Sequence, residues 1–311
     1  MLLSLMLTAL SCQAPVIPKG YALIYGVADY GGGGGSPDLN YTDDDAEALA
    51  ELLQSKGWDV RLRVDGNSGA EATLDRLVND AEDLKGVMSK NDRLLFYFSG
   101  HGIYLNLNGD EPNAAADAPD EVLLLYDSIS TINSFKAKTA TASDVINKTI
   151  SDDSLASILG EIPAATRTVI IDACFAGGFI GDSFTVDTVA SNYTKNRLST
   201  TFYPAEAVKL YLGYKPSTND LPASSFSVLA ASGESEESYE SSSIEHGYFT
   251  YYLLKSPKLA DYNLDGYISL TEAYKYTAVS IENNFNKGSS LTDYQPHVSA
   301  FPVDPVLFKA D

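Results

Sequence analysis

A histidine and a cysteine, far apart in the chain, each follow directly on a short apolar segment. His101 lies between two glycines after RLLFYFS (93–99), and Cys174 follows TVIIDA (168–173). A thiol and an imidazole together make a nucleophile and its proton-transfer partner. Taken singly, each residue would more often be structural, as a small core cysteine or a hydrogen-bonded histidine. Because both occur at the ends of predicted strands, a catalytic dyad is the better interpretation.

The elements that must bring these two residues together alternate along the chain. Apolar segments at 21–30, 59–64, 93–100, 121–128, 167–174 and 225–232 predict strands, and the segments at 43–58, 72–87 and 152–162 predict amphipathic helices. This alternation predicts an α/β fold with a mostly parallel central sheet and helices on both faces. Residues that follow the carboxyl ends of parallel strands converge, so we expect His101 and Cys174 to meet at one site.

The overall charge limits the classes of partner. The chain has 311 residues and a formal net charge of -21, spread along its length. This charge argues against binding to nucleic acid, whose phosphate backbone is also negative. Beyond the N-terminus, no apolar run is long enough to span a bilayer. We therefore expect residues 18–311 to form one globular domain.

The N-terminal segment MLLSLMLTALSCQAP is apolar, too short to span a bilayer, and has small residues before Cys12. It is typical of an export leader over residues 1–17, with an ordinary strand or helix as the less favoured alternative. It is also similar to a bacterial lipoprotein signal, in which the cysteine is lipidated and becomes the new N-terminus. The similarity implies an exported protein (periplasmic, cell-surface or secreted) with a membrane tether at Cys12.

A twelve-residue segment, DYNLDGYISLTE (261–272), has the spacing of an EF-hand calcium loop. Segments 248–260 and 272–285, on either side, are predicted to be helical. An acidic Asp-Gly turn without metal is the alternative, but the number of matching positions favours calcium. Oxygen ligands would come from Asp261, Asn263, Asp265, Tyr267 (through its carbonyl), Ser269 and Glu272, with Gly266 at the sharp turn.

The sequence after the leader resembles the caspase-like cysteine peptidases, especially their metacaspase and bacterial caspase-domain branch. The resemblance rests on YALIYGVADY, DDDAEAL, YFSGHG with His101, LLLYDS, DACFAGG with Cys174, VLAASGESEESYE and HGYFTYYLL. It implies a caspase-like fold, protein or peptide substrates and no organic cofactor. Two readings from other classes stay open: a catalytically silent caspase-like interaction module with a calcium loop, and a cysteine hydrolase that acts on a nonpeptide amide.

The resemblance also implies roles for individual residues. Cys174 would attack the scissile carbonyl as a thiolate, and His101 would assist its deprotonation and protonate the leaving amine. The backbone N–H groups of Gly102 and Cys174 would form the oxyanion hole. His246 and His297 lie outside the catalytic motifs, and we expect them to have surface or packing roles.

Substrate preference and maturation also follow from the resemblance. In the metacaspase branch, aspartates at positions matching Asp45 and Asp172 line the primary specificity pocket, and such carboxylates suit a Lys or Arg side chain. For Asp45 the alternative is a helix N-terminal acid favoured by the macrodipole. Residues 182–224 are predicted to be a long loop, which matches the segment that family members cut during maturation. Lys195 and Arg197 in this loop are the expected positions of self-cleavage.

Overall fold

The computed structural model of the 311-residue chain describes residues 18–30, 38–65, 71–105, 120–174, 176–180, 221, 225–233, 236–288, 294–299 and 304–311. The predicted leader, including Cys12, lies outside the described residues. So does the predicted long loop 182–224, apart from Leu221. Within the described ranges, every helix is too short or too polar to serve as a membrane span.

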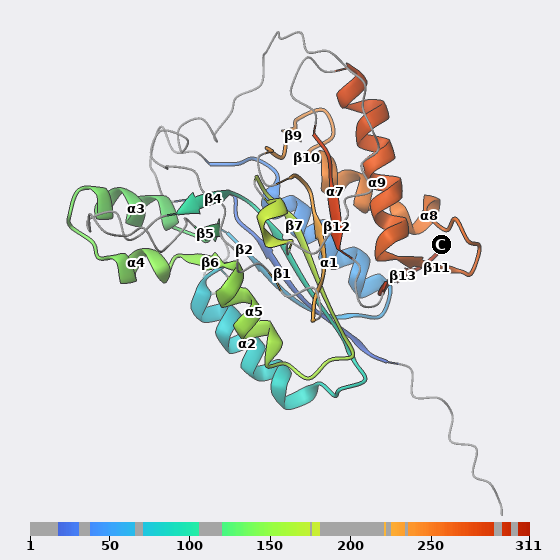
Figure 1. Ribbon diagram of the computed structural model, residues 1–311, viewed down its shortest axis with the longest axis horizontal. Helices are drawn as coiled ribbons and strands as arrows, with labels where there is room; N and C mark the ends of the chain where they lie inside the picture. Colours follow the sequence, from blue (N-terminus) through green and yellow to red (C-terminus); the bar gives the residue numbers. More distant parts are fainter. Residues whose placement is uncertain are drawn as a thin grey trace, which may run out of the picture.

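A six-stranded sheet in the order β12-β8-β7-β3-β1-β2 forms the centre of the domain (Figure 1). Its neighbouring strands are parallel except for β12, which runs antiparallel to β8 at one edge. This arrangement confirms the mostly parallel α/β sheet that the alternation predicted. The strands are β1 (Gly20–Gly26), β2 (Asp59–Val64), β3 (Arg93–Ser99), β7 (Thr166–Asp172), β8 (Ser227–Ala230) and β12 (His297–Ser299).

Helices cover both faces of this sheet and enclose two hydrophobic clusters (Figure 1). Side chains of successive strand residues point to opposite faces, so Leu23 belongs to one cluster and Ile24 to the other. Burial on both faces explains why the central strands read as unbroken apolar runs. The cluster with Ile24 packs against α1 (Thr42–Ser55), α7 (Tyr248–Leu253) and α9 (Leu270–Asn284), and the other packs against α2 (Leu74–Val87) and α5 (Asp152–Gly160).

The segment predicted as a strand at 121–128 does begin as a strand, but it lies outside the central sheet. It forms β5 (Asp120–Leu124) in a separate antiparallel sheet, between β4 (Gly102–Leu105) and β6 (Thr149–Ser151). The physical reason is the short connection that leads into β4, the strand with which β5 pairs. β4 begins only three residues after β3 ends, so it cannot join the central sheet beside β3 as a parallel strand. A parallel neighbour would need a crossover of a dozen or more residues. This small sheet lies beside α3 (Ser128–Lys136) and α4 (Ala142–Ile146) (Figure 1).

The remaining elements surround the carboxyl edge of the sheet and the predicted calcium loop. The predicted helix 248–260 is interrupted, because α7 ends at Leu253 and α8 (Ser256–Leu259) begins with Pro257 near its N-terminus. A proline fits the first turn of a helix but not its interior, so it separates the two helices. The other elements are η1 (Ala176–Phe179), β9 (Glu240–Ser241), β10 (His246–Gly247), β11 (Tyr267–Ser269), η3 (Asn286–Gly288) and β13 (Val306–Lys309).

Candidate active site

The register of β3 and β7 places the two predicted catalytic residues at the same edge of the sheet. Ser99 pairs with Asp172 at the ends of these adjacent parallel strands, and His101 and Cys174 each follow two residues later. The backbone N–H of Gly100 donates a hydrogen bond to the carbonyl of Asp172 at 3.1 Å. The two segments therefore leave the sheet together, as the strand-end argument predicted.

Gly102 is in direct contact with the cysteine segment. A Cβ atom at this position would lie 2.1 Å from the carbonyl oxygen of Cys174, which is closer than any side chain allows. Glycine is therefore required for the close approach of the two segments. This contact explains why the apolar strand β3 is followed by a histidine between two glycines.

His101 is buried, and its backbone is held on both sides. Its N–H donates to the hydroxyl of Tyr30 at 2.7 Å, and its carbonyl accepts from the N–H of Leu124 at 2.9 Å. The imidazole packs against the ring of Tyr30, with 4.6 Å between the ring centroids. The sequence analysis did not identify Tyr30, because it reads as an ordinary aromatic residue at the end of an apolar segment.

Cys174 is half-buried and lies next to the loop that contains Ser238. Its Sγ atom is 3.9 Å from the carbonyl oxygen of Ser238, and the preceding carbonyl of Ala173 accepts a hydrogen bond from Ser232 at 2.9 Å. Burial raises the pKa values of Tyr30 and Tyr294 well above their usual range, and the charge of a Cys174 thiolate adds to both shifts. Two buried phenols therefore lie within electrostatic range of the Cys174 thiol.

Asp172 is a buried carboxylate with three hydrogen bonds. Its Oδ1 accepts from the hydroxyl of Ser238 at 2.6 Å, and its Oδ2 accepts from the N–H and the hydroxyl of Thr250 at 3.2 and 2.7 Å. Burial raises the pKa of Asp172, and these hydrogen bonds oppose the rise. Ser238 therefore contacts both groups: its hydroxyl binds the Asp172 carboxylate, and its carbonyl oxygen lies next to the Cys174 thiol.

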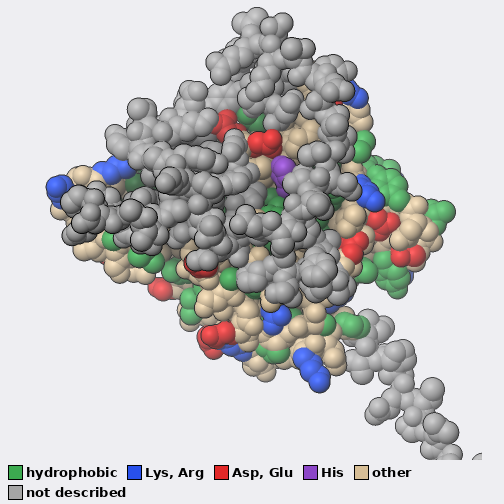
Figure 2. All heavy atoms as spheres, in the orientation of Figure 1, with side chains coloured by type: hydrophobic (Ala, Val, Ile, Leu, Met, Phe, Trp, Pro, Cys, Tyr) green, Lys and Arg blue, Asp and Glu red, His purple; other side chains and the backbone are tan. Residues whose placement is uncertain are grey.

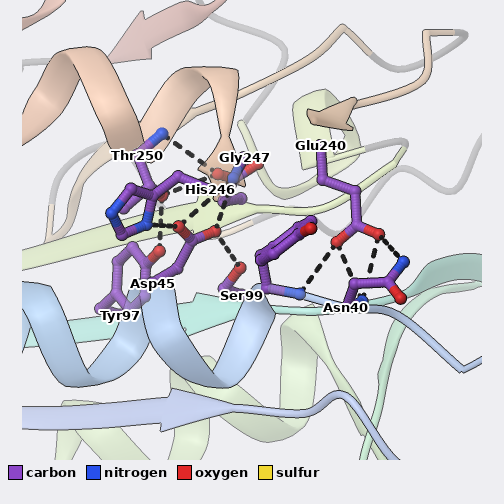
Figure 3. A network of polar contacts seen from close by, with 10 residues as sticks. Asn40, Asp45, Tyr97, Ser99, Glu240, His246, Gly247 and Thr250 are labelled. Atoms are coloured by element: carbon purple, nitrogen blue, oxygen red, sulfur yellow. Dashed lines mark hydrogen bonds and ion pairs between the residues drawn. The ribbon is translucent and has the colours of Figure 1, made fainter. Parts of the chain in front are cut away.

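Asp45 is completely buried and forms the centre of a polar network (Figure 3). It accepts hydrogen bonds from Ser99 at 3.2 Å, from His246 Nδ1 at 2.8 Å, and from the N–H of Gly247 at 3.2 and 3.3 Å. Burial raises its pKa to about 7, although the bond to His246 acts to lower it. The same bond raises the pKa of His246.

These contacts bear on two expectations about single residues. Asp45 lies in the first turn of α1, as the macrodipole alternative expects, and its carboxylate faces β3 and β10. The expected surface or packing role was wrong for His246, which binds the Asp45 carboxylate. Since these two residues are 201 positions apart, no local sequence pattern could have indicated the pair. His297 lies 3.6 Å from Glu236 and is half-buried.

The two buried aspartates converge on Gly247. A Cβ atom there would lie 2.7 Å from Asp172 Oδ2 and 3.0 Å from Asp45 Oδ2. The residue must therefore be glycine, because both carboxylates occupy the space into which a side chain would project. Beside this cluster, Glu240 accepts hydrogen bonds from the N–H groups of Asn40 and Tyr41, which ties β9 to the start of α1 (Figure 3).

The predicted calcium loop has its carboxylates turned toward its own backbone. Asp261 accepts hydrogen bonds from the N–H groups of Asp265 and Gly266 at 3.2 and 3.1 Å. Glu272 accepts from three N–H groups, those of Tyr262, Asn263 and Ser269. Within the described residues, no three His, Cys, Asp or Glu side chains are close enough to form a ready metal site.

The loop is a turn between two helices, because α8 ends just before it and α9 begins near its end. Gly266 has φ +82°, a conformation that favours glycine. After the loop, β11 pairs with the antiparallel strand β13 near the C-terminus. The C-terminal segment thus gives the end of this loop an antiparallel partner strand.

Charged side chains of both signs are interspersed over the described part of the face in Figure 2. This distribution does not mark one strongly charged interaction surface on that face. The polar groups of the site are mostly buried: His101, Asp45 and Asp172 all belong to the buried part of the molecule. The arrangement is therefore a small enclosed cluster of two carboxylates beside a thiol and an imidazole.

Comparisons with known proteins agree with this geometry. A family model described as a caspase domain matches residues 19–289. Among solved structures, a protein from Geobacter sulfurreducens aligns with a TM-score of 0.54 and 20% identity, covering 90% of this chain and 92% of that one. Caspase-1 from Spodoptera frugiperda aligns with a TM-score of 0.52 and 12% identity, covering 94% and 92%. No curated protein sequence matches the chain.

Proposed function

The chain belongs to the caspase-domain family of cysteine peptidases, and from this premise we propose that it is an endopeptidase using Cys174 and His101. The observation that carries the proposal is the register of β3 and β7, which aligns the two segments at one edge of the sheet. Both residue types are present, and each follows the end of a buried strand. A silent interaction module would not need this pairing, so we favour the enzyme.

The residues divide the reaction between them in two steps. The Cys174 thiolate attacks the scissile carbonyl carbon, and the oxyanion that forms accepts hydrogen bonds from the N–H groups of Gly102 and Cys174. His101 donates its proton to the leaving amine as the C–N bond breaks, which leaves a thioester. His101 then takes a proton from water, and the hydroxide attacks the thioester. The C–S bond breaks, the carboxylic acid leaves, and Cys174 is regenerated as the thiolate beside protonated His101.

The proposed preference is for Lys or Arg before the scissile bond. Two buried carboxylates, Asp45 and Asp172, meet beside Gly247, and Asp172 binds Ser238, whose carbonyl contacts the proposed nucleophile. A buried carboxylate is stabilised by a cation, so a guanidinium or ammonium group would be bound there through charge-assisted hydrogen bonds. Asp45 is completely buried and hydrogen-bonded to His246, so in this proposal the two residues contribute to the basic preference as a pair.

We also propose that the loop 261–272 binds calcium. The donor set of carboxylate, amide, hydroxyl and carbonyl oxygens fits a hard cation, and Gly266 has the turn conformation that such a loop requires. The ligands would be Asp261, Asn263, Asp265, Tyr267 (through its carbonyl), Ser269 and Glu272. Binding would exchange hydrogen bonds between carboxylates and loop N–H groups for bonds to the ion.

Export remains part of the proposal through residues 1–17, with lipid attached at Cys12. The support is the apolar segment followed by small residues and a cysteine. A tether of this kind would keep the peptidase outside the cytoplasm and close to a membrane surface. A single acyl chain binds a membrane only weakly, so this tether depends on the several chains that a lipoprotein anchor carries.

The test is hydrolysis of short peptides that differ only in the residue before the scissile bond: Arg, Lys, Asp or Gly, with and without calcium. We expect the wild type to cleave after Arg and Lys, and Cys174→Ala and His101→Ala to lose turnover by about 1,000-fold or more. Asp172→Asn should lose the basic preference, and His297→Ala serves as the control histidine. Turnover retained without Cys174 or His101 would exclude the dyad, and cleavage after Asp would exclude the assigned pocket.

A further inference from the structure

Tyr30 contacts the backbone and the side chain of His101 at the same time. Its hydroxyl accepts a hydrogen bond from the His101 N–H at 2.7 Å and donates one to the carbonyl of Val27 at 2.9 Å. Its ring packs against the imidazole at a centroid distance of 4.6 Å and an interplanar angle of 42°. One side chain therefore links the end of β1 to the turn that follows β3.

The burial of Tyr30 makes this link rigid. The side chain is completely buried, so neither water nor another rotamer is available to replace its contacts. A buried N–H that loses its hydrogen-bond partner destabilises the fold, so the His101 segment is strongly held in this position. On the opposite side, the carbonyl of His101 is fixed by the N–H of Leu124.

The glycine before the histidine is explained by the same hydroxyl. A Cβ atom at Gly100 would lie 2.6 Å from the oxygen of Tyr30 and 2.8 Å from the ring of Phe98. Any larger residue would push the hydroxyl away from the His101 N–H. The sequence Ser-Gly-His-Gly therefore includes one glycine for Tyr30 and another, Gly102, for the cysteine segment.

Burial raises the pKa of the Tyr30 phenol well above its usual range, and the charge of a Cys174 thiolate adds to this shift. The phenol remains protonated at any physiological pH, so it acts as a fixed neutral hydrogen-bonding group and not as a base. It has no bond of its own to break or form in the reaction. Its effect must be exerted through the position of His101.

We propose that Tyr30 is a positioning residue, whose hydroxyl fixes the backbone of His101 and whose ring fixes the imidazole relative to Cys174. The inference rests on the proposed function, since it assumes that His101 activates the thiol. A misplacement of about 1 Å in a reacting group can reduce a rate by about 100-fold. The loss should therefore appear in kcat, while KM for a peptidyl-Arg substrate changes little.

Tyr30→Phe, Tyr30→Leu and Gly100→Ala are the test variants, and Tyr25→Phe is the matched control. Tyr25 is also completely buried, and its hydroxyl donates to Asp80 of α2 at 2.9 Å. Removing this hydroxyl costs a buried hydrogen bond without removing a contact to His101. We expect kcat to fall about 10- to 100-fold in Tyr30→Phe and Gly100→Ala, and further in Tyr30→Leu. Tyr25→Phe should lower the unfolding midpoint but leave kcat unchanged.

A second measurement needs no peptidase activity. The rate of alkylation of Cys174 by iodoacetamide, followed by mass spectrometry of its peptide, reports the thiolate that His101 helps to form. It should fall in His101→Ala and in the Tyr30 variants but not in Tyr25→Phe. Equal kcat and alkylation rates in folded Tyr30→Phe and wild type would overturn the positioning role. If His101→Ala also alkylates normally, the dyad itself fails, and the two failures are thereby distinguished.

Discussion

At the scale of single residues, the buried pair of Asp45 and His246 has consequences for stability. A carboxylate without water is expensive unless it is hydrogen-bonded, and Asp45 has four such bonds from three donors. Its pKa is nevertheless raised to about 7 by burial. The folded protein therefore retains a proton on this pair at pH values where an unfolded chain would have released it.

This difference predicts a loss of stability as the pH rises from about 4 to about 7. Asp45 ionises in the unfolded chain near its ordinary pKa of 3.8, but in the folded chain only near 7, so the unfolded state binds fewer protons in between. His246 acts in the same direction. Because its pKa is raised in the folded state, it stabilises the fold at pH values below its unfolded-state pKa, and this stabilisation is lost as the pH rises through its folded-state pKa. For Asp45 alone, a rise from 3.8 to about 7 corresponds to about 4 kcal/mol.

The measurement is urea unfolding at several pH values for the wild type, Asp45→Asn and Asp44→Asn. Asp44 is the neighbouring exposed carboxylate of α1, so its replacement changes the net charge equally without touching the network. We expect the free energy of unfolding to depend less on pH in Asp45→Asn, and to keep the wild-type dependence in Asp44→Asn. The same slope in all three proteins would contradict a raised pKa for Asp45.

At the scale of elements, the loop 261–272 and the helix that follows share one residue. Glu272 is the last predicted calcium ligand, and it also forms a capping box with Ser269 at the N-terminus of α9. Replacing it by Ala would remove the metal ligand and the cap together, which costs about 0.5–2 kcal/mol for the cap alone. Glu272→Gln keeps the side-chain oxygen for the cap and removes the charge.

We predict that Asp261→Asn combined with Glu272→Gln abolishes calcium binding in calorimetry while leaving the helix content unchanged. The two charged oxygen ligands at the ends of the loop supply much of the affinity for the ion. Asp304→Asn is the control, because Asp304 lies outside the loop and caps only the N–H of Thr271. Calcium binding that survives in the double variant would place the site elsewhere in the chain.

Local periodicity predicted five of the six strands of the central sheet, because each carries its own pattern, but not the three-residue edge strand β12. The strand at 59–64 matches β2 to the residue, and the helix at 72–87 matches α2 within two residues. The small antiparallel sheet was not predicted, since its pairing depends on a short connection and not on the pattern of 121–128. The contact between Asp45 and His246 and the role of Tyr30 also depend on long-range packing, which leaves no local signal.

At the scale of the whole molecule, the family of the chain suggests how it is activated. The proposed active site is an enclosed cluster, and both of its carboxylates are buried in this structure. The family resemblance places a maturation segment after the nucleophile strand. Residues 182–224 occupy this place in the sequence and lie outside the described residues apart from Leu221. They contain Lys195 and Arg197, the residue types that the proposed pocket would accept.

We predict that the purified protein cleaves itself after Lys195 or Arg197. The polar sequence NYTKNRLSTTF has no helical or strand period, which is typical of chain that a protease can enter. Incubation followed by sequencing of new N-termini gives the positions, with Cys174→Ala as the inactive control. Lys195→Gln with Arg197→Gln should abolish these cuts, although Cys174 and His101 are unchanged.

The concentration dependence of this cleavage distinguishes two arrangements of the chain. If the segment enters the site of its own molecule, the rate constant is independent of protein concentration. If one molecule cuts another, the rate rises with concentration, and active protein will cut the Cys174→Ala variant in a mixture. Cuts after Asp alone would contradict the assigned specificity, because two buried carboxylates would have to accept a third negative charge. Cuts after Lys195 or Arg197 that disappear in Cys174→Ala would support the catalytic role of the thiol, the preference for basic residues and self-cleavage of this segment together.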